Sequence, residues 1–416
     1  KKSRPDIVEP VEKPTDALPG WIEWALKLNN SVLPIQGPPG TGKSYNASQM
    51  ILALVAAGKR VGITALSHKV ITSLMHTIYD ESLKRGMQID MMQKIDQNEG
   101  AALGAKWACI NDYVQVKKKI YSFSIIGGTS HFWSHGEVEK TVDYLFVDEA
   151  GQLSLVDTLV CCFATDNLIL LGDPQQLKQP QQGVHPEDTD VSALEHLLNG
   201  KPTIEPEQGI FLGITRRMHP EICEFDSELF YERRLAALPG LEAQTITGNT
   251  RFSGSGMIYH PVMHAGNTNF SAEEVIAIQN LVNDLTKGDV FWTNVNGETR
   301  VLTAKDIKII APYNMQVFEL RDVLGTIEVG TVDKFQGQEA PVIIYSMATS
   351  SPEDAPKGMD FLYSPNRFNV AVSRARGLFI LVGSPALFEP SCNSPEQIKL
   401  ANPFCRFLEK ARIVSP

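Results

Sequence analysis

A glycine-rich stretch that ends in lysine and serine has the residue types that bind phosphate groups. Residues 37–44 read Gly-Pro-Pro-Gly-Thr-Gly-Lys-Ser and fit the pattern G-x-x-x-x-G-K-[ST]. Glycines allow the backbone to wrap closely around phosphate oxygens. Lys43 would add a positive charge beside the β- and γ-phosphates, and the Ser44 hydroxyl would bind magnesium. We therefore predict a nucleoside triphosphate site formed by Gly37, Pro38, Pro39, Gly40, Thr41, Gly42, Lys43 and Ser44.

Two adjacent carboxylates follow an apolar segment further along the chain. Residues 144–147 read Tyr-Leu-Phe-Val and lead directly into Asp148 and Glu149. A carboxylate at a strand end that faces the phosphates can hold magnesium, so we assign Asp148 to the metal together with Ser44. Glu149 stands where a base would orient the attacking water. Such strand ends are common in structural roles, but the position downstream of a phosphate-binding loop favours the catalytic interpretation.

The segments around these residues predict alternating strands and helices. Residues 32–35 read as a buried strand before the phosphate loop, and residues 44–57 read as a helix with apolar residues at helical spacing. A second helix is expected to end near Tyr79. Alternation of this kind predicts a doubly wound parallel sheet that binds its ligands at the carboxyl ends of the strands. The other expected strands cover residues 60–65, 122–127, 144–147 and 167–173.

A second alternating set follows a proline-rich break at residues 201–207. Ser271 and Glu274 have the spacing of a capping box that opens a helix to about residue 286. The pair Asn296 and Gly297 indicates a hairpin turn. Core strands are expected at residues 307–311, 327–332, 342–347 and 378–382.

These patterns divide the chain into an arm and two α/β domains of similar size. We assign residues 1–30 to a charged, proline-rich arm with a short lead-in helix, and residues 31–205 to the first domain. A polar, irregular stretch at about 80–121 reads as a small insertion in that domain. Residues 206–416 form the second domain, which carries no phosphate-binding loop of its own.

Composition excludes some classes of protein and leaves others open. The chain has 48 Asp and Glu against 38 Lys and Arg, a net charge of −10, so any nucleic acid must be held by a local groove. The six cysteines form no C-x-x-C pair, which favours free thiols in a reducing compartment, the cytoplasm or the nucleus. No apolar run reaches membrane-spanning length. Because the chain begins with Lys1 and a linker-like stretch, we expect it to belong to a longer parent.

Six further stretches carry specific patterns. They are DEAGQ at 148–152, GDPQQL at 172–177, RMHP at 217–220, APYNMQ at 311–316, VDKFQGQE at 332–339 and NVAVSRAR at 369–376. Together with the phosphate-binding loop they resemble superfamily 1 helicases. The seven motifs follow the order of that family along residues 32–385, and seven ordered motifs are far more specific than one. The forms Phe-Gln-Gly-x-Glu and Asn-Val-Ala-x-Ser-Arg-Ala look like the branch of the nonsense-mediated-decay helicase and the nuclease–helicase of Okazaki-fragment processing.

This resemblance implies two RecA-like domains that bind one ATP with magnesium in the cleft between them. By the same resemblance, Gln176 would sense the γ-phosphate and the attacking water. Arg217 and Arg374 would act as arginine fingers, which can contribute about 10³–10⁵ in rate. Glu339 would hold the ribose, and Tyr313 would lie at the nucleotide.

Three positions depart from the family pattern. The family usually has a glutamine that reads adenine shortly upstream of the phosphate loop, but residues 19–30 contain none. Where many relatives have a tyrosine that stacks on adenine, this chain has Arg216, whose guanidinium can also stack. His68 replaces an asparagine that contacts phosphate. Base selectivity is therefore an open question.

Nucleic acid in this family crosses the top of both domains. The resemblance implies contacts to phosphate from hydroxyl groups, helix N-termini and backbone amides, which need little net positive charge. His131, Phe132 and Trp133 would stack on bases or, as aromatic residues beside a strand end more often do, pack in the core. The expected partner is single-stranded nucleic acid, with DNA preferred to RNA. The expected contact residues are Ser67, His68, Thr129, Ser130 and Thr331.

The sequence leaves three functional hypotheses. The first is an ATP-dependent helicase or single-strand translocase, 5′→3′ by resemblance, in which ATP hydrolysis drives domain closure. The second is an ATP-gated nucleic-acid clamp that does not unwind. The third is a protein-remodelling ATPase of the AAA+ class, whose loops also read Gly-Pro-Pro-Gly-Thr-Gly-Lys, although those proteins carry a small helical lid instead of a second α/β domain. Relatives are sometimes fused to an N-terminal nuclease, so a nuclease domain N-terminal to this chain in a longer parent is an expected partner.

Overall fold

The computed structural model describes residues 18–96, 104–179 and 191–415 and divides the chain into two compact units. The expected arm at the N-terminus lies outside the described residues except for its lead-in helix, α1 (Leu18–Lys27). The chain passes from one unit to the other between Leu212 and Gly213, a few residues after the expected boundary at 205 and 206. The first unit comprises Lys1–Pro38, Gly42–Pro174 and Lys178–Leu212, and the second comprises Pro39–Thr41, Gln175–Leu177 and Gly213–Pro416.

The first unit alternates strands and helices as its apolar pattern predicts. Its strands are short runs of branched and aromatic residues that are buried on both faces, which is typical of a parallel sheet covered by helices. The strands are β1 (Val32–Gln36), β2 (Val61–Thr64), β3 (Met91–Lys94), β4 (Ala108–Ile110), β5 (Ile125–Gly127), β6 (Tyr144–Val147), β7 (Leu168–Gly172) and β8 (Ile210–Phe211). The helices after α1 are α2 (Lys43–Ala56), α3 (His68–Lys84), α4 (Tyr113–Lys119), α5 (Ser130–Trp133), α6 (Leu155–Cys161) and α7 (Ala193–Leu198).

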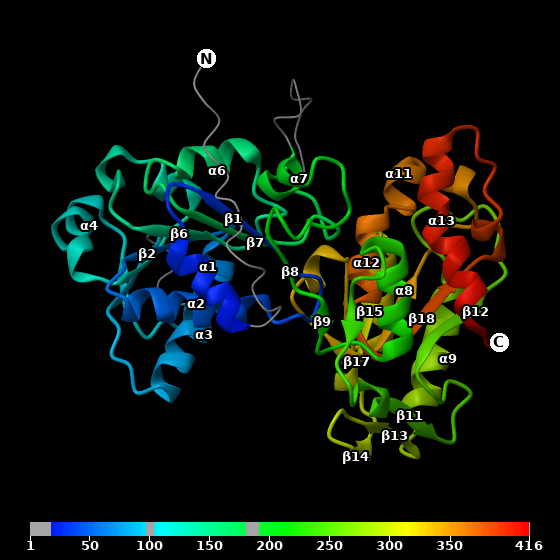
Figure 1. Cartoon of the computed structure of the whole chain (residues 1–416). Coiled ribbons are helices and arrows are strands. Elements are labelled where there is room, and N and C mark those ends of the chain that lie inside the picture. The colour runs from blue at the N-terminus through cyan, green and yellow to red at the C-terminus, as the bar shows by residue number, and fades with distance from the viewer. Residues whose placement is uncertain (1–17, 97–103, 180–190, 416) are drawn as a thin grey trace. The chain divides into compact units, whose positions relative to one another are not determined.

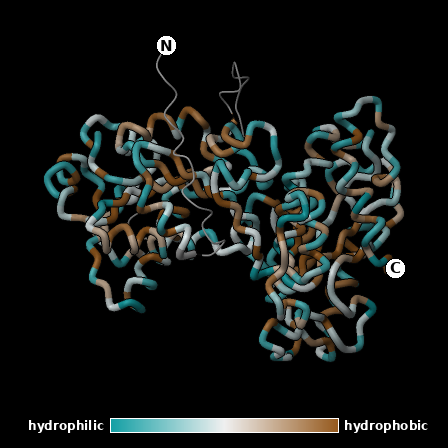
Figure 2. The backbone as a smooth tube through the Cα atoms, in the orientation of Figure 1, coloured by the Kyte–Doolittle hydropathy of each residue, from teal (hydrophilic) through white to brown (hydrophobic). Residues whose placement is uncertain are grey.

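These eight strands form one parallel sheet in the order β4-β3-β5-β2-β6-β7-β1-β8. Figure 1 labels β2, β6, β7, β1 and β8 of this sheet. Side chains alternate between its faces. Ile63 and Phe146 pack with residues of α2 and α3, whereas Leu145 and Val147 pack with residues of α5 and α6. The brown, hydrophobic segments of Figure 2 follow the strands through the interior of the unit. The sheet therefore presents the carboxyl ends of all its strands at one edge.

The segment expected as a small insertion, residues 80–121, contains the end of a helix and two short strands. Helix α3 continues to Lys84, five residues beyond the expected end, and β3 and β4 then add two strands to the edge of the sheet. These strands are only four and three residues long, and β3 ends in Gln93 and Lys94, which are buried in spite of their polarity. The hydrophobic periodicity that identifies a strand is therefore absent from the sequence.

The second unit holds a six-stranded parallel sheet, a three-stranded antiparallel sheet and a parallel pair formed by β9 and β10. Its strands are β9 (Ile214–Thr215), β10 (Ala236–Ala237), β11 (Thr245–Gly248), β12 (Gly256–Pro261), β13 (Val290–Thr293), β14 (Thr299–Val301), β15 (Ile307–Ile310), β16 (Glu328–Gly330), β17 (Ala340–Ser346), β18 (Ala375–Gly383) and β19 (Arg412–Ile413). Its helices are α8 (Pro220–Phe230), α9 (Ala272–Thr286), α10 (Asn314–Leu324), α11 (Gly358–Leu362), α12 (Pro365–Val372) and α13 (Pro395–Lys410).

The parallel sheet of this unit has the order β16-β15-β17-β18-β12-β19. Apolar residues of α9 and α10 pack on one face of it. An aromatic cluster covers the other face, where the rings of Phe368 and Phe404 stack with centroids 4.2 Å apart and Phe379 meets Phe407 edge to face. The expected hairpin is confirmed, because β13 pairs with β14 around a turn that contains Asn296 and Gly297. Among the described residues, no helix is long and apolar enough to cross a membrane.

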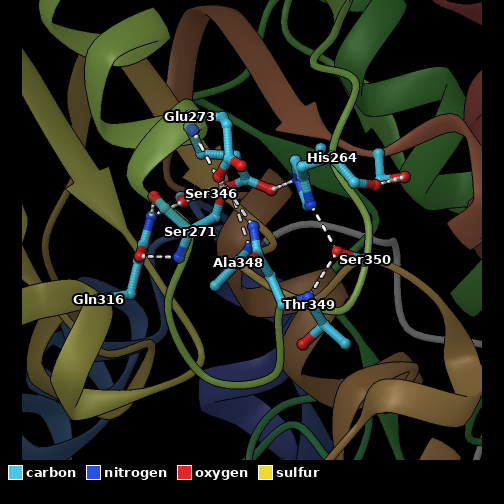
Figure 3. Close-up of polar contacts among 12 residues, drawn as sticks. His264, Ser271, Glu273, Gln316, Ser346, Ala348, Thr349 and Ser350 are labelled. Carbon is cyan, nitrogen blue, oxygen red and sulfur yellow. Dashed lines mark hydrogen bonds and ion pairs between the residues drawn. The ribbon is translucent and has the colours of Figure 1, made fainter.

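The capping box expected at α9 forms only in part. Ser271 Oγ accepts a hydrogen bond from the Glu274 backbone N–H at 3.1 Å, but the Glu274 side chain does not return to the helix end. It turns into the core, where it is fully buried and accepts hydrogen bonds from Ser346 Oγ at 2.5 Å and from Ala348 N at 2.9 Å. Figure 3 labels these two donors, with Ser271, Gln316 and His264 nearby. The Ser271 N–H donates instead to Gln316 Oε1 at 2.9 Å. Glu274 thereby fixes the end of β17.

His264 completes this buried network. Its Nε2 lies 3.0 Å from Glu274 Oε1, and its Nδ1 lies 2.7 Å from Ser350 Oγ. The order Ser–His–Glu resembles a nucleophilic triad, but Ser350 is only 2% exposed and its Oγ accepts a further hydrogen bond from Asn267 N at 2.9 Å. The network is therefore structural. It holds Ala348 in the left-handed region, at a φ of 65°, which a non-glycine residue adopts only when its surroundings enforce it.

Replacing Glu274 by alanine should unfold the second unit more easily. Three hydrogen-bonding groups would lose a buried partner, so we expect the free energy of unfolding to fall by about 3–5 kcal/mol. Urea unfolding followed by circular dichroism measures this loss. Glu273→Ala, an exposed substitution in the same helix, should lower the free energy of unfolding by less than about 1 kcal/mol. Equal effects of the two substitutions would contradict the structural role of the network.

Candidate nucleotide and nucleic-acid sites

The phosphate-binding loop connects β1 to α2, as its sequence predicts. Gly40 and Gly42 have φ values of 74° and 77°, in the left-handed region that glycine adopts without strain. Lys43 begins α2, and its Nζ donates a hydrogen bond to the Gly37 carbonyl at 2.5 Å. The lysine stem runs so close to Gly37 that a Cβ there would lie 2.3 Å from Lys43 Cγ. The lysine therefore lies folded across the loop, and the Ser44 beside it is exposed.

Asp148 and Glu149 follow the last residue of β6. Asp148 is 7% exposed, and its backbone N–H donates to the Thr64 carbonyl at the end of β2 at 2.8 Å. Burial, together with the nearby Glu149 carboxylate, raises the pKa of the Asp148 carboxyl to about 7, although the Glu149 backbone N–H and Lys43 act in the opposite direction. Glu149 has a φ of 53°, which is uncommon for a non-glycine residue and is typical of functional sites. Its backbone N–H donates to Asp148 Oδ1 at 2.9 Å.

The turn after these carboxylates lies directly against the end of β7. Ala150 N donates to the Leu171 carbonyl at 2.7 Å. A Cβ on Gly151 would lie 2.7 Å from the Asp173 carbonyl oxygen, so only glycine fits at this position. The stretches DEAGQ and GDPQQL are therefore in direct contact. From the sequence, only their order along the chain related them.

In the second unit, two arginines flank one glutamate. Arg217 Nε donates a hydrogen bond to Glu339 Oε2, and Arg217 Nη1 donates to the Ser373 carbonyl at 3.1 Å. Arg376 Nε lies 3.8 Å from Glu339 Oε1. Gln244 connects the two arginines, because its Nε2 donates to the Arg217 carbonyl at 2.8 Å and its Oε1 accepts from Arg376 Nε at 3.2 Å. The structure thus pairs two predicted site residues, Arg217 and Glu339, with each other.

Arg374 is a buried arginine with 2% of its surface exposed. Its guanidinium donates to the carbonyls of Val370 at 3.1 Å and Gln338 at 3.3 Å. Its Nη2 donates to Gln176 Oε1 at 3.1 Å, and both residues belong to the second unit. Two residues that the family resemblance assigned to the γ-phosphate are therefore in direct contact. Gln244 and Arg376 were missed, although Arg376 lies within one of the quoted motifs.

The remaining predicted nucleotide residues have contrasting environments. Tyr313 is 6% exposed and its ring lies 5.5 Å from that of Phe361; burial raises the pKa of its phenol. Arg216 is exposed. Its guanidinium is thus accessible, whereas the tyrosine ring is covered.

Four of the five expected nucleic-acid contacts lie at one edge of the first sheet. Ser67 and His68 follow β2, and Thr129 and Ser130 follow β5, which is the parallel neighbour of β2. The Ser67 hydroxyl caps the N-terminus of α3. Thr331 follows β16 in the second unit. The parallel topology therefore gathers the first four residues, as the sequence predicts.

Base stacking by Phe132 and Trp133 is not supported by their positions. They are 1% and 0% exposed, respectively, and both pack in the hydrophobic core. Trp133 Nε1 donates to the Ile63 carbonyl at 3.1 Å, so its one polar group is also satisfied. Of the three expected aromatic residues, His131 alone is exposed. The stacking hypothesis is wrong for the other two because the short helix α5 turns their rings toward the sheet.

Comparison with known proteins relates both halves of the chain to helicases. Two family models, each described as an AAA domain, match residues 21–194 and 189–386. The protein mov-10-B.2 of Danio rerio, which is named as a helicase, is 29% identical to this chain over 407 residues. The match covers 84% of this chain and 39% of that protein. DNA polymerase alpha-associated DNA helicase A of Schizosaccharomyces pombe is 24% identical over 409 residues, which cover 84% of this chain and 60% of that protein.

Among solved structures, the DUF1998 helicase MrfA bound to DNA has a TM-score of 0.50 and 11% identity, covering 95% of this chain and 52% of that chain. This likeness concerns the fold alone. Together with the two parallel sheets, it confirms the predicted fold class of two RecA-like α/β domains. The second unit is therefore not the small helical lid expected of a protein-remodelling ATPase. The chain spans less than two thirds of the length of these curated relatives.

The close approach of Gly151 to Asp173 can be tested by adding a side chain at position 151. Gly151→Ala should force the turn after Glu149 away from Asp173 and lower the free energy of unfolding by about 1–3 kcal/mol. Urea unfolding measures this effect. The matched control is Gly136→Ala in the same unit, where an added Cβ meets no atom within 4 Å. If both variants unfold at the same denaturant concentration, the turn is not held as described.

Proposed function

We propose that this chain, which is similar to helicases in both of its halves, is a superfamily 1 helicase that hydrolyses ATP in response to single-stranded nucleic acid and uses the energy to translocate or to separate strands. One observation carries the proposal. A phosphate-binding loop and a strained, partly buried Asp148–Glu149 pair follow strands of one parallel sheet, at its carboxyl edge. Parallel α/β sheets bind their ligands at that edge.

The residues at this edge fit a magnesium–nucleotide complex. A buried carboxylate whose pKa is raised by burial gains from a nearby cation, and Asp148 meets this condition. Among the described residues there is no group of three or more His, Cys, Asp or Glu side chains that could cage a metal. Magnesium is typically held by one or two carboxylates together with substrate phosphates, which matches Asp148 and the Ser44 hydroxyl. Bound magnesium would neutralise charge that develops on the phosphates.

We assign the roles in ATP hydrolysis to a few residues of this site. Lys43 would leave the Gly37 carbonyl and bind the β- and γ-phosphates, which compete for it as stronger acceptors. Glu149 would accept a proton from the attacking water. Gln176 would orient that water, as the family resemblance implies.

The arginines of the second unit complete the proposal. Arg217 and Arg374 would stabilise the charge of the transferred phosphoryl group, and Glu339 would bind the ribose together with Arg216 and Tyr313 at the base. Arg217 and Glu339 are paired in the free protein, so each is neutralised until a nucleotide replaces its partner. Exchange of this kind makes both side chains available only when nucleotide is present.

Nucleic acid would bind along the carboxyl edge of the first sheet through Ser67, His68, Thr129 and Ser130, and through Thr331 of the second unit. Hydroxyl groups and the N-terminus of α3 contact phosphates without requiring a basic surface, which suits a chain of net charge −10. We propose 5′→3′ movement and a preference for DNA over RNA.

The test is ATP hydrolysis measured without nucleic acid, with single-stranded DNA and with single-stranded RNA at one low salt concentration. We expect at least one strand type to stimulate the rate severalfold or more. Equal rates in all three conditions would contradict the proposal. Strand displacement from a tailed duplex then separates a helicase from a clamp, because a clamp would hydrolyse ATP without releasing a strand.

Two substitutions separate binding of the nucleotide from its hydrolysis. Lys43→Ala should abolish stimulated hydrolysis and weaken ATP binding, because the loop loses its only lysine. Glu149→Gln should retain ATP binding but lower kcat by about 10²–10⁴-fold, because the amide cannot accept the proton. Exposed Glu139→Gln controls for the loss of one carboxylate and should leave kcat unchanged. Normal kcat in Glu149→Gln would remove Glu149 from the mechanism.

A further inference from the structure

Lys94, the last residue of β3, is a buried cation beside the predicted nucleic-acid edge. Its side chain is 8% exposed. Its ammonium donates a hydrogen bond to the Ile95 carbonyl at 3.0 Å and lies 4.8 Å from the centre of the Tyr113 ring. Both partners are neutral. A buried charge is stable only when an opposite charge compensates for its loss of water, so Lys94 requires an anion nearby.

One carboxylate supplies this anion from the solvent side. Asp96 is 77% exposed, and its Oδ1 lies 4.0 Å from Lys94 Nζ. Its Oδ2 lies 3.7 Å from His68 Nε2. A single exposed carboxylate thus faces two nitrogen atoms that belong to different elements. At these distances and this exposure the ion pair is weak, about 0–1 kcal/mol, so a competing anion displaces it easily.

The position of this cluster follows from the sheet order. Strand β3 is the parallel neighbour of β5, which in turn is the neighbour of β2. The carboxyl end of β3 therefore lies on the same edge as Ser67, His68 and Thr129. His68 belongs both to the cluster and to the predicted nucleic-acid contacts.

We propose that His68 and Lys94 form a binding site for one backbone phosphate of single-stranded nucleic acid, and that the Asp96 carboxylate occupies this site in the free protein until the phosphate displaces it. The proposal rests on the proposed function, because it assigns a further contact to the same nucleic-acid surface. A phosphodiester carries the same charge as the carboxylate and offers two acceptor oxygens to the same two nitrogens. Asp96 is thus an internal competitor that lowers affinity, and Lys94 is a contact that the sequence analysis did not predict.

The test is the affinity of nucleotide-free protein for fluorescein-labelled oligo(dT) and oligo(U), measured by fluorescence anisotropy over a range of salt concentrations. Asp96→Asn removes the competing charge and should raise the affinity about two- to fivefold at low salt, which corresponds to an exposed ion pair of up to about 1 kcal/mol. Asp166→Asn is the matched control. Asp166 is also exposed and is also paired with a lysine, and its substitution by asparagine changes the net charge by the same amount.

Lys94→Met should weaken binding and reduce the slope of log affinity against log salt by about 0.7, the value for one phosphate contact on a single strand. Lys140→Met, which removes the lysine of the control pair, should leave that slope unchanged. In the Lys94→Met background, Asp96→Asn should raise the affinity less than it does in the unmodified protein, because the two residues act on one phosphate and only His68 remains to bind it. Melting temperatures check that each variant is folded, and the exposed Asp96→Asn substitution remains informative if Lys94→Met does not fold.

The outcomes distinguish this inference from the proposed function. If the unmodified protein binds neither oligonucleotide, the proposed function fails and this inference fails with it. If the protein binds but Asp96→Asn and Asp166→Asn have equal affinities, the inference alone is overturned. A gain restricted to oligo(dT) or to oligo(U) would support the site and identify the sugar that its surroundings select.

Discussion

A carboxylate held almost out of water at the end of β6 is the constraint on which the first unit depends. Asp148 keeps its place because its backbone bonds to the end of β2 and the following turn lies against the end of β7. Burial raises the pKa of its carboxyl to about 7, so the charged form of Asp148 is disfavoured in the folded protein. A cation bound beside the phosphate-binding loop would stabilise that charged form. In the proposed function, a magnesium–nucleotide complex would compensate for the charge of this carboxylate.

The same pattern of provisional partners recurs away from Asp148. Lys43 is bonded to a backbone carbonyl, Arg217 to Glu339, and Lys94 lies near Asp96. In these three cases, a charged side chain proposed to bind a ligand has another partner within the chain. By contrast, Glu274 has three strong internal partners and no proposed ligand. Burial alone therefore does not separate the charges proposed to bind a ligand from the structural charges in this protein.

Much of the architecture could be predicted because parallel strands buried on both faces are continuous apolar runs. The strands around Ile63, Phe146 and Ile169 were found in this way, and the phosphate loop fixed the functional edge. The edge strands β3 and β4 were not predicted because both are short and because β3 contains buried polar residues whose partners, such as His68 and Tyr113, are distant in sequence. No local pattern reveals such compensation.

Side-chain direction was the least predictable property. Glu274 has the spacing of a capping residue, yet its carboxylate turns inward because Ser346 and Ala348, more than 70 positions later, offer it two donors. Phe132 and Trp133 follow a strand end where stacking residues are expected, yet both lie in the short helix α5 with their rings packed in the core. Gln244 connects Arg217 to Arg376 only because three separate segments converge. Tertiary packing decides each of these cases.

The central claim is that Asp148 bears a charge that the free protein tolerates for the sake of its ligand. Because the folded-state pKa is raised above that of the unfolded chain, the folded protein loses stability as pH rises from about 4 to about 7 and keeps that loss at higher pH. The most direct measurement is therefore the free energy of unfolding of Asp148→Asn at pH 8, with and without magnesium and a non-hydrolysable ATP analogue. The account predicts that the variant is more stable than the unmodified protein without ligand, by up to about 4 kcal/mol, and gains little from the ligand. A variant that is less stable without ligand, yet fully stabilised by magnesium and the analogue, would contradict it.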